Sequence, residues 1–249
     1  MNIKLLSPSC WTDYELIDSG AYEKLERFGR YVIARPEPQA IWNKSLSDAE
    51  WQQRADAYFK KDKKSEDRGE WICKPKMPQQ WFVNYRYGDM SIRMRLGLTS
   101  FKHVGVFPEQ AENWNFISDQ VKRIGTGAKV LNLFAYTGGA TLAAKSAGAD
   151  VTHVDSVKPV VSWARENMEV SGLDGVRWIV EDALKFVQRE VRREKKYNGI
   201  ILDPPAYGRG ANGEKWVLEE NINELITLCG QLLESSNSFL VLNLYSMGL

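Results

Sequence analysis

The sequence predicts an α/β protein in which a doubly wound parallel sheet follows a smaller β-rich domain. One observation is that Val130–Phe134 is a short apolar run, typical of a strand buried on both faces. Another is that Thr137-Gly138-Gly139 interrupts this run before an Ala-rich helical segment, which indicates strand, tight turn and helix. The third is that later strand-like segments also end in an aspartate: Asp155, Asp182 and Asp203.

These aspartates carry a functional implication. In an open parallel sheet the carboxyl ends of the strands line one crevice, and ligands bind there. Asp155 follows Asn132 at about the 20-residue spacing expected of a ribose-binding acid. Glycines suit the turn after the first strand because the backbone changes direction sharply and a ligand can lie against it. The helix that follows presents free N–H groups beside that ligand.

The remaining elements of this half follow in order. Pro108 and Gly125 delimit a helix, and we expect further helices at Val160–Met168, Ala183–Arg193 and Trp216–Leu233. The polar, glycine-rich stretch after Tyr207 is predicted to be a loop that acts as a mobile lid or as a substrate-ordering segment. The predicted parallel strands are Val130–Phe134, Val151–Asp155, Arg177–Val180, Gly199–Asp203 and Phe239–Tyr245. The chain stops after the fifth, so we expect the last strands of such a sheet to be missing.

The stretch before residue 109 alternates short strands with Gly and Pro. Strands are predicted at Tyr14–Asp18 and Arg30–Ala34, and a helix begins after Ser47, with Glu50 as its capping-box partner. Two runs on either side of Gly88-Asp89 predict a hairpin. We therefore expect residues 1–108 to form a β-rich substrate-recognition domain and residues 109–249 a second domain.

The predicted hairpin has two unlike faces. Alternation places Val83, Tyr85, Tyr87, Met90, Ile92 and Met94 on a core face. The other face carries Arg86, Arg93 and Arg95 beside Phe82. A cationic face with an aromatic suits an RNA backbone, and an ordinary solvent-facing surface is the alternative.

Composition narrows the class of protein. The 249 residues carry a net charge of +1, so an RNA-binding protein of this kind needs local basic patches. Cys10, Cys73 and Cys229 are far apart, which argues against disulfides and a metal site, and we expect His153 to be structural. The sequence shows neither a membrane-spanning run nor a secretory signal, so a cytoplasmic protein is expected.

Two motifs carry a family resemblance. Leu133-Phe-Ala-Tyr-Thr-Gly-Gly139 together with Asp203-Pro-Pro-Ala-Tyr207 resembles the class I S-adenosylmethionine-dependent methyltransferases, and within them the large-subunit ribosomal RNA base methyltransferase branch. The likeness extends from about Phe101 to the C-terminus and implies a Rossmann-like fold. It also implies S-adenosylmethionine as cofactor and an RNA base as substrate.

The resemblance implies roles for individual residues. Residues 132–139 would hold the methionine part of the cofactor, Asp155 the ribose and Asp182 the adenine edge. The cofactor residues implied are Asn132, Phe134, Ala135, Tyr136, Thr137, Gly138, Gly139, Asp155, Ser156, Asp182, Ala183, Lys102, Phe107 and Gln110. For the segment that carries the last three, an interdomain linker is the alternative. Asp203, Pro204, Pro205 and Tyr207 would form the catalytic segment against the target base, with Arg209 added to the three hairpin arginines as an RNA contact.

The chemistry of methyl transfer agrees with this composition. Displacement at a sulfonium needs positioning more than acid–base groups. The prolines stiffen the segment so that Asp203 can accept hydrogen bonds from a base, which must be unstacked. The C5 branch of the family uses a cysteine after the fourth or fifth strand, but this sequence has Ala206, Tyr207 and Ser246-Met-Gly248 there. Transfer to nitrogen is therefore favoured.

Two other functions share part of the pattern. A nucleotide-dependent oxidoreductase would have the same strand, turn and ribose acid, but it does not explain Asp203-Pro-Pro-Ala-Tyr207. A non-catalytic RNA-binding or assembly factor could retain the cofactor pocket.

Overall fold

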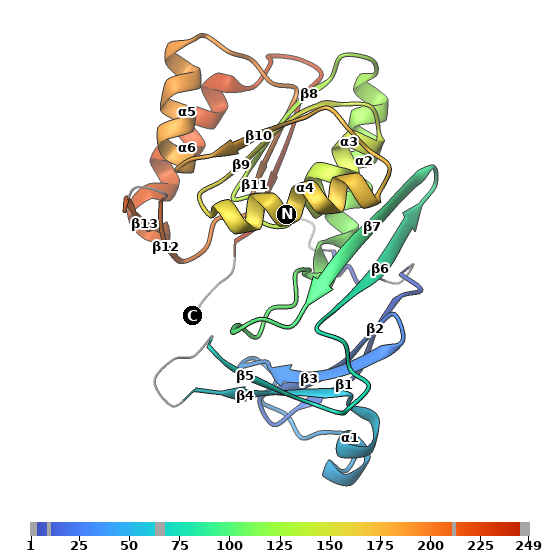
Figure 1. Cartoon of the computed structure of the whole chain (residues 1–249). Coiled ribbons are helices and arrows are strands. Elements are labelled where there is room, and N and C mark those ends of the chain that lie inside the picture. The colour runs from blue at the N-terminus through green and yellow to red at the C-terminus, as the bar shows by residue number, and fades with distance from the viewer. Residues whose placement is uncertain (1–3, 9–10, 63–67, 211–212, 245–249) are drawn as a thin grey trace. The chain divides into compact units, whose positions relative to one another are not determined.

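A computed structural model describes residues 4–8, 11–62, 68–210 and 213–244 (Figure 1). The chain divides into two compact units. Pro8–Tyr87 and Arg93–Pro108 belong to the N-terminal unit, whereas Glu109–Leu249 with Gly88–Ile92 and Met1–Ser7 belong to the C-terminal unit. No helix of the described residues is long and apolar enough to cross a membrane.

The C-terminal unit is built on a five-stranded sheet with the order β10-β9-β8-β11-β14. Every adjacent pair is parallel, which confirms the predicted α/β fold. The strands are β8 (Lys129–Leu133), β9 (Asp150–Asp155), β10 (Val176–Val180), β11 (Gly199–Leu202) and β14 (Phe239–Leu242). Tyr245, the predicted end of the last strand, lies outside the described residues.

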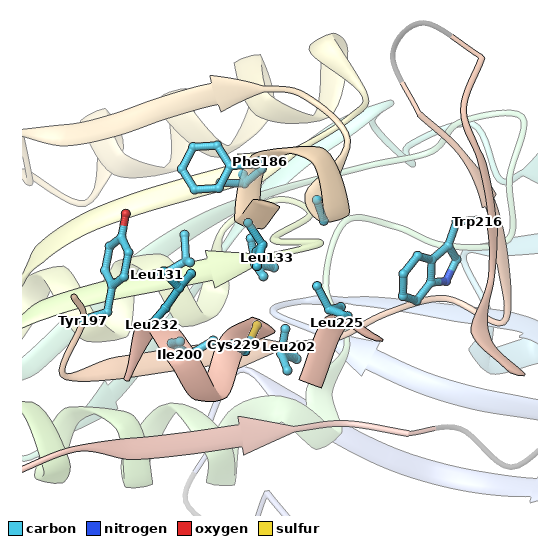
Figure 2. Packing of buried hydrophobic residues seen from close by; sticks show 13 residues of the cluster. Leu131, Leu133, Phe186, Tyr197, Ile200, Leu202, Trp216, Leu225, Cys229 and Leu232 are labelled. Atoms are coloured by element: carbon cyan, nitrogen blue, oxygen red, sulfur yellow. The ribbon is translucent and has the colours of Figure 1, made fainter. Parts of the chain in front are cut away.

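Helices cover both faces of this sheet, as expected of a doubly wound fold (Figure 1). The helices are α2 (Ala111–Ile124), which follows a short 3-10 turn at Pro108–Gln110, and α3 (Gly139–Ser146), α4 (Lys158–Val170), α5 (Ala183–Arg192) and α6 (Leu218–Leu232). Helices α5 and α6 pack on one face in a cluster that includes Phe186, Leu202 and Cys229 (Figure 2). Helices α2 and α3 cover the opposite face around Val130 and Val151.

One prediction in this unit was wrong. The stretch after Tyr207 forms an antiparallel hairpin of β12 (Tyr207–Arg209) and β13 (Lys215–Val217) where a loop and an early helix were expected. Trp216 pairs with Gly208 in the hairpin, so α6 begins only at Leu218. The backbone N–H of Val217 donates to Asn221 Oδ1 at 2.9 Å, which completes the helix start.

The N-terminal unit contains a second sheet with the order β1-β2-β3-β4-β5. All its pairs are antiparallel except β3 with β4. Its elements are β1 (Tyr14–Gly20), β2 (Glu23–Phe28), β3 (Tyr31–Pro36), α1 (Asp48–Arg54), β4 (Ala57–Lys61) and β5 (Gly69–Cys73). The predicted capping box between Ser47 and Glu50 starts α1 and is confirmed. The β-rich character of this part of the chain is confirmed as well.

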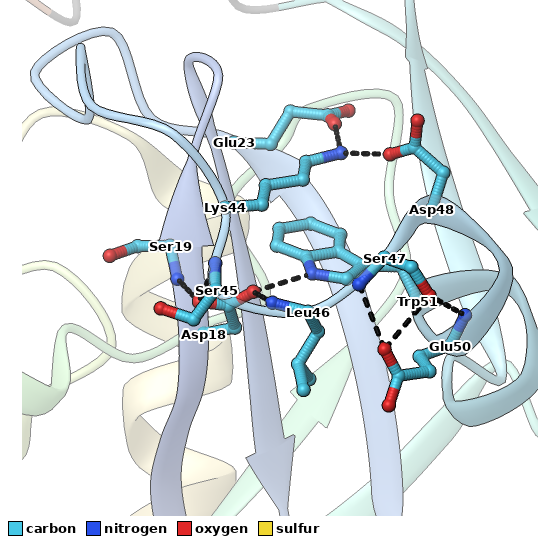
Figure 3. Close-up of polar contacts among 10 residues, drawn as sticks. All are labelled: Asp18, Ser19, Glu23, Lys44, Ser45, Leu46, Ser47, Asp48, Glu50 and Trp51. Atoms are coloured by element: carbon cyan, nitrogen blue, oxygen red, sulfur yellow. Dashed lines mark hydrogen bonds and ion pairs between the residues drawn. The ribbon is translucent and has the colours of Figure 1, made fainter.

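Asp18 anchors the segment that leads into α1 (Figure 3). Its carboxylate accepts hydrogen bonds from the backbone N–H groups of Ser45 and Leu46 at 3.2 and 2.9 Å. It also accepts one from the indole of Trp51 at 2.8 Å. Burial raises the pKa of Asp18, but these bonds outweigh it and leave the pKa below its usual value. A network of this kind stabilises the unit and leaves little capacity for a ligand.

The predicted hairpin forms from β6 (Gln80–Tyr87) and β7 (Met90–Gly97), which make a separate two-stranded sheet. Its predicted core face is buried at Val83, Tyr85, Met90, Ile92 and Met94, whereas Tyr87 is only partly buried. Arg86 and Arg93 are exposed on the other face, and Arg95 is partly buried. The guanidinium carbon of Arg93 lies 4.6 Å from the centroid of the Phe82 ring.

Candidate functional site

The candidate site is the edge of the parallel sheet where the strands reach their carboxyl ends. The first part of this edge is the turn between β8 and α3. Phe134 and Tyr136 adopt left-handed backbone conformations there, with φ of 55° and 49°. Bulky residues adopt this conformation only where the surroundings enforce it. Ala135 N–H donates to the Val154 carbonyl at 3.1 Å, which ties the turn to β9.

The two glycines of this turn serve different purposes. Gly138 has a φ of 92° and occupies the N-cap position of α3, where a left-handed backbone favours glycine. Gly139 is required by packing, because a Cβ atom there would lie 2.5 Å from Cζ2 of Trp114 in α2. The glycine that the sequence suggested for ligand approach is thus explained by the contact between α2 and α3. Gly138 leaves the first turn of α3 without a side-chain cap among the described residues.

Asp155 forms the second part of the edge, at the end of β9. Its Oδ2 accepts the backbone N–H of Tyr136 and its Oδ1 that of Val157, each at 2.9 Å. Burial raises the pKa of Asp155, and these backbone donors oppose the shift. The backbone N–H of Ser156 also hydrogen-bonds to this carboxylate. Two carboxylate oxygens offer about four acceptor positions, so Asp155 keeps capacity for a ribose-type hydroxyl group.

Beneath the turn lies a buried polar chain. Asn132 Nδ2 donates to Thr141 Oγ1 at 2.9 Å, and that hydroxyl lies 2.9 Å from Nδ1 of His153. Burial lowers the pKa of His153 to about 3, so its ring is neutral, and it packs on Trp178 at 4.8 Å. His153 therefore has a structural place, as expected.

Asp182 and the β12–β13 hairpin form the next part. Asp182 caps α5, where its Oδ1 accepts the backbone N–H of Lys185 at 2.9 Å. Ser156 Oγ donates to the Arg209 carbonyl at 3.2 Å, which joins the end of β9 to β12. The hairpin is also tied to α5 by an ion pair of 2.6 Å between Lys185 and Glu214. Ala183, the first residue of α5, is buried.

Asp203 follows β11 and leads into Pro204 and Pro205. Its Oδ1 atom is buried and has no hydrogen-bond partner in the described part of the chain. Burial and the neighbouring Glu109 raise the pKa of Asp203 to about 6, against a hydrogen bond from the Asn243 side chain. An unpaired buried carboxylate oxygen is costly, so it marks a place where a donor is expected to bind.

Trp216 connects the segment Asp203–Tyr207 to the turn between β8 and α3. Its indole donates to the Pro205 carbonyl at 2.7 Å, and its ring packs 4.8 Å from that of Phe134. Figure 2 shows its side chain beside the hairpin strands. Tyr207 lies at the start of β12 and is exposed, as a base-stacking role requires.

The remaining predicted site residues belong to other elements of the chain. Lys102 and Phe107 belong to the N-terminal unit, where the Lys102 carbonyl accepts from Arg35 at 3.3 Å and Phe107 packs against His103. Gln110 lies at the N-cap of α2, where its side chain bonds to Asn113 and Asn243. Arg86, Arg93 and Arg95 belong to the β6–β7 hairpin. Their assigned roles stay predictions.

Comparison with known proteins decides the family. A family model described as S-adenosylmethionine-dependent methyltransferase matches residues 49–242, well over half of the chain. The chain belongs to this family. The oxidoreductase alternative is thereby set aside, and S-adenosylmethionine is the family's cofactor.

Solved structures agree with this methyltransferase assignment. A SAM-dependent methyltransferase from Agrobacterium tumefaciens is 42% identical, with a TM-score of 0.88, over 95% of this chain and 74% of that one. SMU.776, solved as a complex with SAH, is 20% identical with a TM-score of 0.72, over 94% of this chain and 61% of that one. The second likeness shows the shared fold alone.

Curated relatives are ribosomal RNA large subunit methyltransferases K/L. The protein from Shewanella frigidimarina is 31% identical over 138 residues, which is 54% of this chain and 18% of that protein. The protein from Shewanella baltica strain OS155 is 28% identical over 159 residues, 58% of this chain and 21% of that protein. The chain thus spans about a fifth of the length of these curated relatives.

Sequence reasoning missed three residues of this candidate site. Asn113 and Asn243 contact each other and Gln110, and Glu109 lies near Asp203. These residues belong to no recognisable sequence motif, so their place at the site becomes visible only in the fold. The one available signal was the position of Asn243, immediately past an apolar run that predicts a strand.

Proposed function

We propose that this chain transfers the methyl group of S-adenosylmethionine to a nitrogen atom of a base in RNA, with ribosomal RNA as the favoured substrate. The observation that carries the proposal is Asp203 Oδ1, buried and without a partner among the described residues, at the carboxyl end of β11. A carboxylate oxygen in this place can accept a hydrogen bond from an amino group or a ring N–H of a base. Pro204 and Pro205 restrict the backbone that carries it.

The residues of the sheet edge fit the proposed cofactor. When bound, S-adenosylmethionine supplies an electrophilic methyl group. Asp155 would hold the ribose with the acceptor capacity that its backbone donors leave unused. The uncapped first turn of α3 would receive its carboxylate. Asn132, Asp182 and the remaining cofactor residues named from the resemblance keep their proposed roles around these two contacts.

Asp203 would hold the acceptor nitrogen in line with the methyl group. Positioning of this kind supplies most of the rate enhancement for a displacement at a sulfonium. With a pKa of about 6, Asp203 is ionised at neutral pH and accepts hydrogen bonds. The positive charge that develops on the nitrogen is favoured beside this carboxylate. Tyr207 would stack on the base.

The cysteines support transfer to nitrogen. A C5 transfer needs a thiolate near the acceptor base. Cys229 is 1% exposed in the core under α6, and burial raises the pKa of its thiol to about 12. Cys73 belongs to β5 of the N-terminal unit. Cys10 and Ser246-Met-Gly248 lie outside the described residues.

RNA is favoured as substrate by two independent features. The curated relatives named above are ribosomal RNA methyltransferases, and the β6–β7 hairpin exposes Arg86 and Arg93 with Phe82 on one face. Arginines and an exposed aromatic suit phosphates and unpaired bases. We propose that Arg86, Arg93, Arg95 and Arg209 contact RNA. A ribosomal RNA substrate also agrees with a cytoplasmic protein.

The domain division expected from the sequence becomes part of the proposal. Residues 1–108 would form the substrate-recognition domain and residues 109–249 the methyltransferase domain. The two compact units support this division, although Gly88–Ile92 group with the C-terminal unit.

The test combines cofactor binding with transfer. Calorimetry measures S-adenosylmethionine binding, and labelled methyl incorporation into total RNA measures transfer. Asp203→Ala should lower turnover by about 100-fold or more and leave cofactor affinity within a few-fold. Asp174→Ala, at an exposed turn after α4, is the matched control and should behave as the parent. Normal cofactor binding without transfer to any RNA would favour the non-catalytic alternative, and label in protein alone would overturn the RNA substrate.

A further inference from the structure

Resting on the function proposed above, we infer that Asn243 is a positioning residue for Asp203. Its side chain hydrogen-bonds to the Asp203 side chain, and Oδ1 of Asp203, which has no partner among the described residues, is the oxygen left to receive the acceptor base. Gln110 and Asn113 in turn hold Asn243 in the orientation that this requires.

Strand register brings the two residues together. Strands β11 and β14 are parallel neighbours, and Leu202 is paired with Leu242. The next residues along the two strands are Asp203 and Asn243, so their side chains leave the sheet edge beside each other. The backbone N–H of Asn243 donates to the Leu202 carbonyl at 2.9 Å, which fixes the backbone of Asn243 beside the end of β11.

The amide network fixes the direction of each hydrogen bond. Asn113 Nδ2 donates to Gln110 Oε1 at 2.8 Å and to Asn243 Oδ1 at 2.9 Å. Asn243 Nδ2 donates to Gln110 Oε1 at 3.1 Å. The Asn243 side chain also hydrogen-bonds to the Asp203 side chain, and Nδ2 is its only donor atom. An amide nitrogen has two protons, so both are assigned in each asparagine.

This arrangement allows Asn243 only one role toward Asp203. If its amide were turned over, its oxygen would face the carboxylate, and its nitrogen would face the Asn113 donor. Both contacts would be repulsive, so the amide is held as a donor to Asp203. The carboxylate is then oriented by a neutral group that binds one oxygen and leaves the other unpaired.

The same contact opposes the electrostatics of the surroundings. Burial and the negative charge of Glu109 favour the protonated form of Asp203, whereas the Asn243 donor favours the ionised form. Glu109, in the 3-10 turn that precedes α2, is the charged group that acts on Asp203 in the described residues. The balance leaves the pKa at about 6, so Asp203 can accept a hydrogen bond at neutral pH.

The first test measures Asp203 directly in the cofactor-free protein. Carboxyl carbon NMR titration of aspartate-labelled protein, with the signal assigned by Asp203→Asn, gives its pKa. Asn243→Ala should raise that pKa by about 1 to 2 units, since it removes a hydrogen bond to a charged group. Asn243→Leu should do the same if the alanine variant folds poorly. Gln110→Ala should raise it less, because the donor remains but is held less firmly.

The matched control is Asn198→Ala. Asn198 immediately precedes β11 at the opposite end of the sheet, where its Oδ1 accepts the Lys129 N–H at 3.0 Å. Its loss should lower stability without moving the Asp203 titration. A pKa of Asp203 that is the same in the parent and Asn243→Ala would overturn the inference, whatever happens to activity.

A second readout separates this inference from the proposed function. The pH profile of turnover on RNA should have an acidic limb near pH 6 in the parent, set by Asp203. In Asn243→Ala that limb should move upward with the NMR pKa, while cofactor affinity stays within a few-fold. If Asp203→Ala is as active as the parent, the proposed function fails. If Asp203→Ala is inactive but the limb of Asn243→Ala does not move, only the role of Asn243 fails.

Discussion

The backbone N–H of Tyr136 donates a 2.9 Å hydrogen bond to Oδ2 of Asp155. The end of β9 therefore holds the turn that follows β8, in which Tyr136 has a left-handed backbone. A change at Asp155 acts on the cofactor site in two ways, because it removes the proposed ribose acceptor and releases the turn.

Asp155→Ala should weaken S-adenosylmethionine binding by roughly 30- to 150-fold. This corresponds to the loss of a charge-assisted pair worth about 2–3 kcal/mol. Isothermal calorimetry checks the prediction. Asp150→Ala is the control, since Asp150 begins the same strand at its other end and is exposed. An unchanged dissociation constant for Asp155→Ala would remove Asp155 from the cofactor site.

Asp203→Asn should lower the rate of methyl transfer and raise the folding stability at high pH. Because the folded pKa of about 6 lies above the unfolded value of about 3.9, folding stability falls as pH rises through that interval. Asparagine cannot ionise, so the variant avoids this loss. We expect it to be about 1–3 kcal/mol more stable than the parent at pH 8 and to have no such advantage at pH 4.

Urea denaturation of the cofactor-free protein at both pH values checks the predicted difference in folding stability. The transfer assay should show the same variant to be at least about 100-fold slower. A variant less stable than the parent at pH 8 would show that Asp203 is not held against its ionisation.

Trp216→Phe should slow transfer more than it weakens cofactor binding. The change removes the 2.7 Å hydrogen bond to the Pro205 carbonyl but keeps a ring against Phe134. We expect turnover to fall about 10-fold, as one positioning bond is lost next to Asp203. Trp178→Phe, which keeps a ring against His153, is the comparison and should leave turnover near that of the parent. Equal losses in both variants would indicate general loosening of the core.

Asp18→Ala should destabilise the N-terminal unit by about 3 kcal/mol, because a buried indole N–H and backbone N–H groups lose their acceptor. The pKa of Asp18 is lowered in the folded protein, so its contribution is present at neutral pH and is lost as pH falls through that pKa. Denaturation at pH 7 and pH 3 should show a large difference from the parent at pH 7 that shrinks at pH 3. Asp48→Ala, whose side chain is 83% exposed, should change stability by less than about 1 kcal/mol.

The parallel sheet could be predicted because its strands are apolar runs bounded by glycine, proline or aspartate. Strand β2 could not, since Glu23–Phe28 contains charges that suggest a surface segment. In the fold its Glu26 is fully buried and paired with Arg35 at 2.6 Å. The β12–β13 hairpin was missed for a related reason, because a glycine-rich polar stretch favours a loop until Trp216 is seen to be buried.

The candidate site could likewise be predicted only in part from the sequence. Asp155 and Asp203 follow strands and could be placed at one edge from the sequence. Asn243 and Asn113 are far apart in the chain, and their contact depends on how α2 packs beside the end of β14. Packing between distant elements determines such a contact, and no spacing in the sequence encodes it.

The central claim is that Asp203 positions a nitrogen acceptor without help from a cysteine. A protein with Cys10, Cys73 and Cys229 all replaced should transfer methyl groups within a few-fold of the parent rate. Conservative replacements are needed at Cys229, which is buried in the core.

Single-turnover transfer to bulk RNA, followed by mass spectrometry of the nucleosides, tests this claim most directly. The account predicts an N-methylated nucleoside from both the parent and the cysteine-free protein, and about 100-fold slower transfer by Asp203→Ala. Recovery of 5-methylcytosine, or loss of transfer in the cysteine-free protein, would contradict it and support a covalent C5 mechanism.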